Sequence, residues 1–253
     1  MDTSRHAGKV AIITGVGNGI GRATVLRMAA EGAACIGCDV NAAAMEETRK
    51  LLAEKGLSAN LVIADVTKQE DVDRLVAAAG DRVDILCNVA GIMDFFLPLG
   101  EMDDATWDRV IGVNLTGVMR LSRACVQKME PQGKGAIVTV ASKASVGAGA
   151  SGTAYTTSKH GVIGLVKSIA YFYGSKGIRS NAVLPGAVAT NIGTSAYPKS
   201  EWAMGRAQLS MATMNPVPAE PDAIAAAISW LASDEASNVN GATLLDDGGW
   251  ASA

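Results

Sequence analysis

Several features that would place the protein in a particular class are missing from its 253 residues. Lysine and arginine are scattered rather than grouped, and the net charge of -3 argues against nucleic acid or an anionic membrane surface as a partner. No apolar run approaches the roughly 20 residues of a membrane span. Residues 1–8 lack the apolar core of a secretion signal. A cytoplasmic protein without a membrane or nucleic-acid partner is therefore expected.

Side chains that bind metal ions are also scarce. The two histidines are His6 and His160, and no second cysteine or histidine pair accompanies Cys35 and Cys38. These two cysteines lie in a stretch typical of a β-strand, where residues three apart face opposite sides. We therefore expect neither a metal site nor a redox disulfide, and interpret the four cysteines as free thiols in buried or half-buried positions.

The sequence does contain a regular alternation of short apolar runs and helix-length amphipathic stretches. Hydrophobic residues make up 49% of the chain and charged residues 19%, which is enough for a sizeable core. Strands are expected at residues 10–14, 34–38, 61–64, 83–87, 136–140, 180–184 and 242–245. This alternation predicts one domain over residues 1–253, a doubly wound, Rossmann-like α/β fold with about seven parallel strands.

Capping residues mark several helix boundaries. Asn41 and Asp103 are placed to cap two helices, the second of which is long. Thr67 and Glu70 have the spacing of a capping box, in which each side chain accepts a backbone hydrogen bond at the start of a helix. These signals support the alternation of strand and helix.

The least regular part of the chain is residues 187–220, which contain several methionines and prolines among small residues. A stretch of this length without periodicity is usually a functional lid or binding loop. The alternative is a surface excursion with a helix of its own. We favour a substrate lid, because the stretch follows the sixth strand at the edge where open α/β sheets bind ligands.

A glycine-rich turn follows the first strand. Residues 14–21, TGVGNGIG, end that strand and open the first helix, so backbone N–H groups and the helix dipole converge where a pyrophosphate would bind. The G-x-x-x-G-x-G spacing at Gly15, Gly19 and Gly21 departs from the strict G-x-G-x-x-G frame. A glycine-rich turn with no ligand is the alternative, but the position at the first crossover favours a nucleotide.

Two acidic residues end neighbouring strands. Asp39 ends the second strand, where a carboxylate accepts hydrogen bonds from both ribose hydroxyls and repels a 2′-phosphate. No arginine or lysine stands at positions 18, 40 or 41, so NAD is expected as the cofactor rather than NADP. A loop-starting aspartate is the alternative. Asp65 is a weaker candidate of the same kind for the adenine end.

Tyr155 and Lys159 lie four residues apart on one face of a predicted helix. A free tyrosine, with a pKa of about 10, is a poor base near neutral pH, and an adjacent ammonium favours its phenolate. Alone, this spacing also fits a surface tyrosine beside a solvated lysine. Ser142 ends the fifth strand on the same edge as the glycine turn. Asn114, within an apolar segment, is either functional or a core asparagine satisfied by the backbone.

Together these residues resemble the short-chain dehydrogenase/reductase family, in the branch with chains of this length, over nearly the whole sequence. The matching pieces are TGVGNGIG at 14–21, Asp39, Asp65 with Val66, NVAG at 88–91, Asn114, Ser142, Tyr155 with Lys159, and PGAVAT at 185–190. Two positions depart from the family pattern. Val89 replaces a second asparagine, and Lys143 follows Ser142 where a small residue is more usual. The sequence offers no physical account of Lys143.

The resemblance implies an NAD-dependent oxidoreductase that interconverts a secondary alcohol and a ketone by hydride transfer. Tyr155 would be the general acid or base, and Ser142 would orient the substrate oxygen. Lys159 would hold the nicotinamide ribose and lower the pKa of Tyr155. Asn114 would hold a water that relays protons to Lys159.

The resemblance also assigns binding residues. The cofactor would be bound by Gly15, Asn18, Gly19, Ile20, Asp39, Asp65, Val66, Asn88, Ala90, Gly91, Tyr155, Lys159, Pro185, Gly186, Val188 and Thr190. The Val188 backbone and the Thr190 side chain would hold the carboxamide. Besides Ser142 and Tyr155, the candidate substrate contacts are residues that follow strand ends or lie in the expected lid. These are Met93, Phe95, Ala144, Ala187, Trp202 and Met204.

Two other functions are weighed against this one. A 3-oxoacyl thioester reductase belongs to the same family but usually uses NADPH, which Asp39 disfavours. A non-catalytic nucleotide sensor is disfavoured by the intact Ser142, Tyr155 and Lys159. The expected substrate is a small to medium, largely apolar alcohol or ketone, whose identity the sequence does not fix. The family further implies a homotetramer, in which Trp250 is hypothesised to cap a neighbouring subunit's site.

Overall fold

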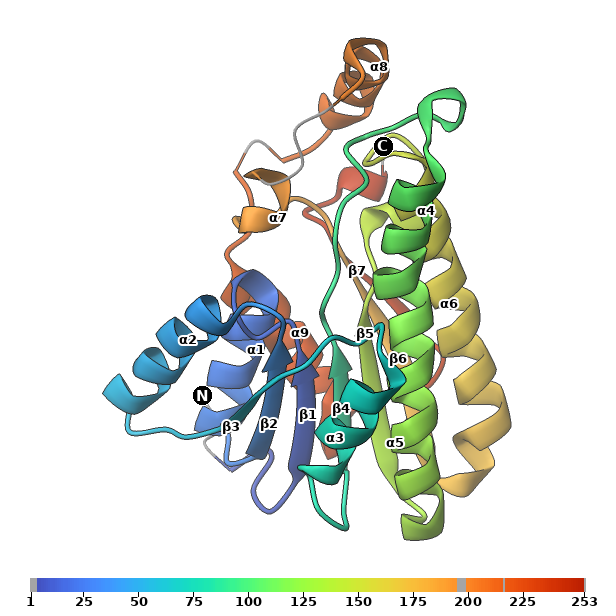
Figure 1. The fold of residues 1–253 in the computed structure, drawn as a ribbon. Coiled ribbons are helices and arrows are strands. Elements are labelled where there is room, and N and C mark those ends of the chain that lie inside the picture. The colour runs from blue at the N-terminus through green and yellow to red at the C-terminus, as the bar shows by residue number, and fades with distance from the viewer. Residues whose placement is uncertain (1–3, 195–198, 216, 253) are drawn as a thin grey trace.

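The computed structural model describes residues 4–194, 199–215 and 217–252. Its centre is a seven-stranded sheet in the order β3-β2-β1-β4-β5-β6-β7, in which every neighbouring pair is parallel (Figure 1). The strands are β1 Val10–Thr14, β2 Ala34–Asp39, β3 Asn60–Ile63, β4 Ile85–Asn88, β5 Gly135–Val140, β6 Ile178–Pro185 and β7 Thr243–Asp246. The predicted doubly wound parallel sheet is thus confirmed.

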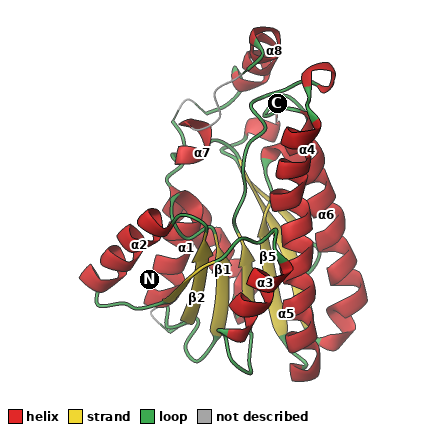
Figure 2. Ribbon diagram, in the orientation of Figure 1, coloured by secondary structure: helices red, strands yellow, loops and turns green. Residues whose placement is uncertain are grey.

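Helices cover both faces of the sheet (Figure 2). The α-helices are α1 Gly19–Ala30, α2 Ala42–Glu54, α3 Gln69–Ala77, α4 Asp104–Ile111, α5 Val118–Gln132, α6 Thr153–Tyr173, α7 Asn191–Thr194, α8 Glu201–Met211 and α9 Pro221–Ala232. A π-helix, Gly112–Gly117, joins α4 to α5. Short 3-10 helices occupy Leu99–Glu101, Lys143–Ser145, Gly174–Lys176, Asp234–Ala236 and Trp250–Ser252.

The alternation of side chains along each strand divides the core into two layers. Ala11 and Ile13 of β1 pack with residues of α1 and α9 on one face of the sheet. Ile12, between them, packs with residues of α3, α5 and α6 on the other face. Because both faces are covered, the strands read as continuous apolar runs rather than as alternating ones.

Two of the three predicted caps are confirmed. Asn41 accepts a hydrogen bond from the Ala44 N–H at 3.0 Å, and Asp103 caps α4 in the same way. The predicted capping box at Thr67 and Glu70 is wrong, because α3 begins later, at Gln69. The Thr67 hydroxyl instead donates to Oδ1 of Asp65 at 2.7 Å, so a turn after β3 uses the side chain that was expected to cap the helix.

The stretch after β6 has secondary structure of its own. It contains α7 and α8, and its two ends meet in an isolated parallel bridge between Val188 and Ala219. The side chain of Ser200 caps α8 by accepting from the Ala203 N–H at 3.2 Å. The excursion is therefore a closed unit at the carboxyl ends of the strands, and α8 is its outermost part (Figure 1).

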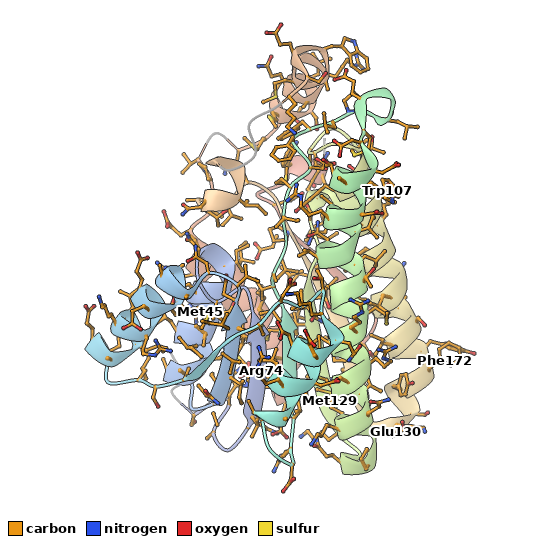
Figure 3. The ribbon with its side chains drawn as sticks, in the orientation of Figure 1. Met45, Arg74, Trp107, Met129, Glu130 and Phe172 are labelled. Carbon is orange, nitrogen blue, oxygen red and sulfur yellow. The ribbon has the colours of Figure 1, made fainter. Side chains whose placement is uncertain are left out.

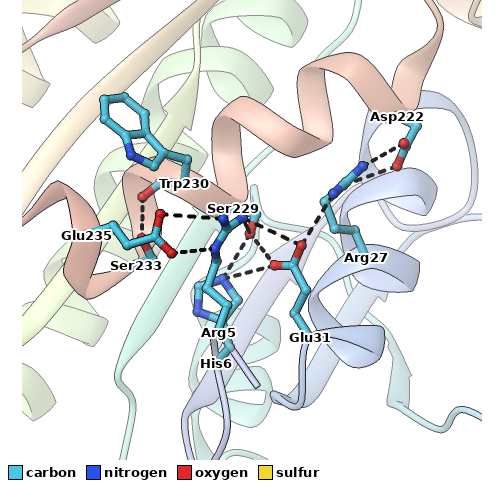
Figure 4. A network of polar contacts seen from close by, with 9 residues as sticks. All are labelled: Arg5, His6, Arg27, Glu31, Asp222, Ser229, Trp230, Ser233 and Glu235. Atoms are coloured by element: carbon cyan, nitrogen blue, oxygen red, sulfur yellow. Dashed lines mark hydrogen bonds and ion pairs between the residues drawn. The ribbon is translucent and has the colours of Figure 1, made fainter. Parts of the chain in front are cut away.

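A buried polar cluster fastens the first described residues to the body of the protein (Figure 4). Glu31, which follows α1, is fully buried, and it accepts a hydrogen bond from Ser229 of α9. Arg27 and Arg5 lie 3.3 and 3.7 Å from the same carboxylate, and His6 lies 3.5 Å away. Burial lowers the pKa of His6. Arg5 and His6 precede β1, so this cluster lies toward the amino ends of the strands.

The remaining sequence-based exclusions concern membranes and metals. Within the described ranges, no helix has both the length and the apolar character needed to span a membrane. Among the same residues, no group of three or more metal-binding side chains comes together. Cys35 and Cys38 both lie in β2, and all four cysteines are free and buried, as predicted.

Burial makes the cysteines unreactive. It raises the pKa of Cys35, Cys38 and Cys125 to about 12, and that of Cys87 also rises. Since the thiolate is the reactive form, a thiol reagent such as Ellman's reagent should label no cysteine of the folded protein at pH 8 and all four after denaturation. Rapid labelling of a folded sample would contradict the buried positions.

Candidate active site

A cavity of about 650 Å³ opens along the carboxyl ends of the strands, which is a size suited to a small-molecule ligand. All but one of the cofactor residues predicted from the sequence lie on its wall. They are Gly15, Asn18, Gly19, Ile20, Asp39, Asp65, Val66, Ala90, Gly91, Tyr155, Lys159, Pro185, Gly186, Val188 and Thr190. The cavity thus brings together the loops that follow β1 to β6.

The glycine-rich turn after β1 is packed so closely that a side chain at Gly15 or Gly19 would meet its neighbours. Gly15 has a φ of +73°, and a Cβ there would lie 3.0 Å from the Cα of Ala90. A Cβ on Gly19, whose φ is also positive, would lie 2.8 Å from Cγ2 of Thr190. Asn18 caps α1 by accepting from the Gly19 N–H at 2.6 Å. The first turn of α1 therefore faces the cavity as the cradle that a phosphate group requires.

Asp39 lies at one end of the cavity with both carboxylate oxygens fixed. Oδ2 accepts from the Gly17 N–H at 3.0 Å, and Oδ1 accepts from the Asn41 N–H at 2.9 Å. Arg22, which reaches the carbonyl of Gly17, does not line the cavity and forms an ion pair with Glu47 at 2.9 Å. This end of the described wall is therefore acidic, without a lysine or arginine beside Asp39.

Asp65 and Val66 lie on the wall next to Asp39, as expected. Oδ1 of Asp65 accepts from both the backbone N–H and the hydroxyl of Thr67, at 2.9 and 2.7 Å. Val66 packs against Gly117 in the π-helix, where a Cβ would lie 2.8 Å from Cγ2 of the valine. The turn after β3 is thus fixed from both sides.

The ends of β1 and β4 are joined by the side chain of Thr14, the first residue of the glycine-rich motif, which was given no role of its own from the sequence. Oγ1 of Thr14 accepts from the N–H groups of Val89 and Ala90, at 2.9 and 3.0 Å. Asn88, which was expected to line the adenine-side ribose, does not line the cavity. Its amide points into the core and donates to Ser122 at 3.1 Å, because strand alternation turns it to the buried face.

Tyr155 and Ser142 meet at the other end of the cavity. Burial raises the pKa of Tyr155 to about 12, although a hydrogen bond with Ser142 lowers it in part. Ser142 caps the 3-10 helix Lys143–Ser145, accepting from the Ala144 N–H at 3.1 Å while its own N–H donates to Ser145 at 3.2 Å. This capping box fixes where the Ser142 hydroxyl points.

Lys159 is buried beside Tyr155. Its Nζ lies 5.5 Å from the centroid of the tyrosine ring and donates to the carbonyl of Val140 at 2.8 Å. Burial lowers the pKa of Lys159 to about 8. The expected lowering of the Tyr155 pKa by Lys159 is not found in the protein alone, because burial disfavours the phenolate and the ammonium alike.

Asn114 lies inside the π-helix and holds the loop that follows β4. Its amide accepts from the Ile92 N–H at 2.9 Å and donates to the Ile92 carbonyl and the Ser158 hydroxyl, at 3.0 and 3.2 Å. The side chain is therefore a core asparagine satisfied largely by backbone, and it does not line the cavity. A Cβ on Gly91 would lie 3.4 Å from Asn114 Oδ1 and 3.5 Å from Lys159 Nζ.

Asp94 is a positioning residue that the sequence analysis missed. It is fully buried, and its two oxygens accept from the N–H groups of Gly152 and Tyr155, each at 2.9 Å. The carboxylate thus ties the loop after β4 to the first turn of α6, where an anion is also favoured by the helix dipole. Its neighbours Phe95 and Phe96 both have positive φ, so the loop adopts a conformation that Asp94 helps to fix.

Some of the predicted substrate contacts line the cavity and others do not. Met93 and Phe95 lie on the wall, joined by Arg109, whose guanidinium donates to the Met93 carbonyl at 3.2 Å. Four others do not line the cavity: Ala144, Ala187, Trp202 and Met204. The 3-10 helix turns Ala144 into the core, and Ala187 pairs with Ala219 at the base of the excursion. Trp202 lies on the outer side of α8 and is 67% exposed.

Comparison with known proteins identifies the family and supports the fold. A family model described as enoyl-(acyl carrier protein) reductase matches residues 15–251. The chain belongs to the short-chain dehydrogenase/reductase family. This confirms the family predicted from the sequence, and it makes the protein an oxidoreductase that uses a nicotinamide cofactor.

Relatives match over the full length of this short-chain dehydrogenase/reductase. The 3beta-hydroxysteroid dehydrogenase 2 of Eggerthella lenta is 42% identical and covers 99% of both chains. Levodione reductase has a TM-score of 0.90 at 33% identity, covering 98% of this chain and 100% of its own. A putative NAD(P)-dependent gluconate 5-dehydrogenase from Beutenbergia cavernae, with bound NADP at low occupancy, has a TM-score of 0.88 at 34% identity, covering 99% and 100%.

Asp94→Asn should disturb the position of Tyr155, because the two backbone N–H groups bond to different oxygens of Asp94 and the variant replaces one of these oxygens with an NH2 donor. We expect the free energy of unfolding to fall by about 1–3 kcal/mol and kcat to fall by up to about 100-fold as Tyr155 is displaced. Removing the charge of Asp94 also removes one cause that raises the pKa of Tyr155. The pH at which alcohol oxidation rises should therefore move down.

Asp108→Asn is the matched control, since Asp108 is an exposed aspartate of α4. Thermal or urea unfolding and a pH profile of kcat on both variants test the prediction. Equal behaviour of the two variants would contradict the positioning role of Asp94.

Proposed function

We propose that the protein is an NAD-dependent dehydrogenase that interconverts a secondary alcohol and a ketone, with Tyr155 exchanging the proton of the substrate oxygen. One observation carries the proposal: Tyr155, Ser142 and Lys159 share one end of a cavity whose other end holds Asp39. Both ends lie along the carboxyl edge of the parallel sheet, where open α/β folds bind dinucleotides.

The protein's own residues handle the oxygen and the proton, and the bound nicotinamide supplies or accepts the hydride. Tyr155, with a pKa of about 12, is protonated at neutral pH and so is ready to donate to a carbonyl oxygen that gains negative charge. The hydroxyl of Ser142 orients that oxygen. Lys159, with a pKa of about 8, is a neighbouring group that can resupply the proton. The relay through a water held by Asn114 stays a prediction.

The choice of NAD rests on Asp39. Its carboxylate is held by two backbone N–H groups, so it cannot swing away to make room for a 2′-phosphate. The cations on the described cavity wall, Lys159 and Arg109, belong to other parts of the cavity. Like charges placed together cost several kcal/mol. A structural relative that holds NADP makes this choice the part of the proposal that most needs a test.

For the substrate, a hydroxysteroid is the first candidate to test, because one full-length relative is described as a 3beta-hydroxysteroid dehydrogenase. Apolar side chains on the wall, including Ile92, Met93, Val113 and Ile192, support an apolar substrate. The alternative is an acyl thioester, as the description of the matching family model names an acyl carrier protein. Turnover of a 3-oxoacyl thioester with NADPH would favour that alternative.

We also propose a homotetramer, as the family implies. Two features support contacts through α6 and the sheet edge. Tyr171 and Phe172 form an edge-to-face pair with ring centroids 5.2 Å apart, and both are exposed on α6. Figure 3 shows Phe172 pointing away from the helix and the body of the protein. β7 is an edge strand of the sheet, where a second copy can add its own strand.

Tyr155→Phe is expected to abolish most turnover and leave cofactor binding intact. Removing a positioned general acid costs roughly 10²- to 10⁴-fold in rate. The test measures NADH oxidation with a panel of ketones, including 3-oxosteroids, together with the Kd of NADH. Tyr173→Phe, at the carboxyl end of the same helix, is the matched control. Full activity of Tyr155→Phe would rule out Tyr155 as the proton donor, and tight NADH binding by an inactive wild type would favour a sensor.

Asp39→Ser is expected to weaken the preference for NADH. The ratio of kcat/KM with NADPH to that with NADH should rise by at least about tenfold, because the repulsion of the 2′-phosphate disappears. Asp81→Ser, at an exposed site in the turn before β4, is the control for a lost negative charge. A wild-type protein that already prefers NADPH would overturn the role assigned to Asp39.

A further inference from the structure

Helix α8 is attached to the body of the protein at both of its ends. At its amino end, the hydroxyl of Ser200 donates to Glu101 at 2.9 Å, and Lys199 donates its N–H to the carbonyl of Phe95 at 3.2 Å. These partners belong to the loop between β4 and α4. At its carboxyl end, Ser210 contacts the loop between β5 and α6. The helix therefore spans the two loops that frame the reacting end of the cavity.

The attachment at Ser210 has three parts. Nε1 of Trp250 donates to the Ser210 carbonyl at 2.7 Å, and Nζ of Lys143 lies 3.4 Å from the Ser210 hydroxyl. The same ammonium lies 5.0 Å from the centroid of the Trp250 ring, which is cation–π distance. A Cβ on Gly149 would lie 2.9 Å from Cβ of Ser210, so the backbone approaches closely here. We call Lys143, Ser210 and Trp250 the α8 clamp.

Trp250 is placed in the clamp by its own chain. It is only 6% exposed, and it follows a turn in which Asp247 accepts from the N–H groups of Gly249 and Ala251, at 3.0 and 2.8 Å. A Cβ on Gly186, in the wall of the cavity, would lie 2.9 Å from Asp247. Trp250 thus makes its contacts within its own chain, and the hypothesis that it also caps a neighbouring subunit's site stays a prediction.

Lys143 links the clamp to the reacting end of the cavity. It is the first residue of the 3-10 helix that Ser142 caps, so the residue that would orient the substrate oxygen is directly followed by the residue that holds α8. No atom of Lys143, Ser210 or Trp250 lines the cavity. The clamp therefore acts on the position of α8 and of the Ser142 loop, and not by touching substrate.

We propose that Lys143 and Trp250 are positioning residues that hold α8 against the Ser142 loop and thereby set the affinity for substrate. The inference rests on the proposed function, because it takes the reacting end of the cavity as the substrate site. A weaker clamp lets the carboxyl end of α8 open more often, which is a local opening and not global unfolding. A smaller fraction of the molecules then has α8 closed against the Ser142 loop, so the apparent affinity for substrate falls. The groups that move the proton are unchanged.

The first arm of the test needs no substrate. Hydrogen exchange of the α8 amides is compared in the wild type, Lys143→Met and Lys143→Arg, with Lys50→Met, an exposed lysine of α2, as control. Lys143→Met should speed exchange at residues 201–211 by about 2- to 30-fold, the range for losing one cation–π contact, and leave α6 unchanged. Lys143→Arg keeps a cation over the indole and should restore slow exchange.

Trp250→Phe is the second variant. It removes the N–H donor but keeps an aromatic ring, so this buried position stays filled and the protein should still fold. It too should speed exchange of α8. Unchanged exchange of α8 in both Lys143→Met and Trp250→Phe would overturn the clamp, whatever the enzyme does.

The second arm is kinetic. With a ketone that the wild type reduces, Lys143→Met should raise KM by about 2- to 30-fold with a much smaller change in kcat, and Lys143→Arg should restore KM. A fall in kcat at constant KM would overturn the effect on substrate affinity. If α8 exchanges faster but the wild type turns over no alcohol or ketone, the clamp stands as a contact and the proposed function fails, together with the claim on affinity.

Discussion

The burial of a phenol and an ammonium side by side is the constraint on which the site depends. In a low-dielectric environment, neither Tyr155 nor Lys159 keeps its ordinary pKa, and each must be held by groups that do not move. The Val140 carbonyl at the end of β5 receives the ammonium of Lys159, and Asp94 fixes the turn of α6 that carries the tyrosine. Ser142, fixed by its capping box, reaches the phenol. The irregular features of the structure, including the strained loop after β4 and the π-helix, surround this pair.

The topology explains why these groups meet a dinucleotide cleft. The strand order reverses between β1 and β4, and at such a point the loops that follow neighbouring strands separate and leave a crevice. Thr14 closes the base of that crevice by holding the first residues after β4. The glycine turn and Asp39 then lie on one side and the Tyr155 helix on the other. The cavity can therefore run from Asp39 at one end to Tyr155 at the other without a second domain.

Local signals predicted the fold and much of the cavity wall from the sequence alone. The glycine turn, Asp39 and the Tyr155–Lys159 spacing are each readable within a few residues, and the strands show as apolar runs. Asp94 was missed because its partners, Gly152 and Tyr155, lie 58 and 61 residues further along the chain.

Other residues were assigned to the cavity wall but do not line it, because a residue beside a site residue in the sequence was assumed to face the cavity as well. Asn88 ends a wall-forming strand but alternates into the core, and Ala144 follows Ser142 but turns inward with the 3-10 helix. Trp202 lies in the expected lid yet faces outward from α8. Lys143, unexplained in the sequence, gains a physical account only when α8 and Trp250 are placed beside it. The measurement that tests the central claim most directly is isotope transfer from NADH dideuterated at C4 to a ketone substrate. The account predicts deuterium on the carbinol carbon of one stereoisomer of the product, and an alcohol whose carbinol hydrogen comes from water would contradict it.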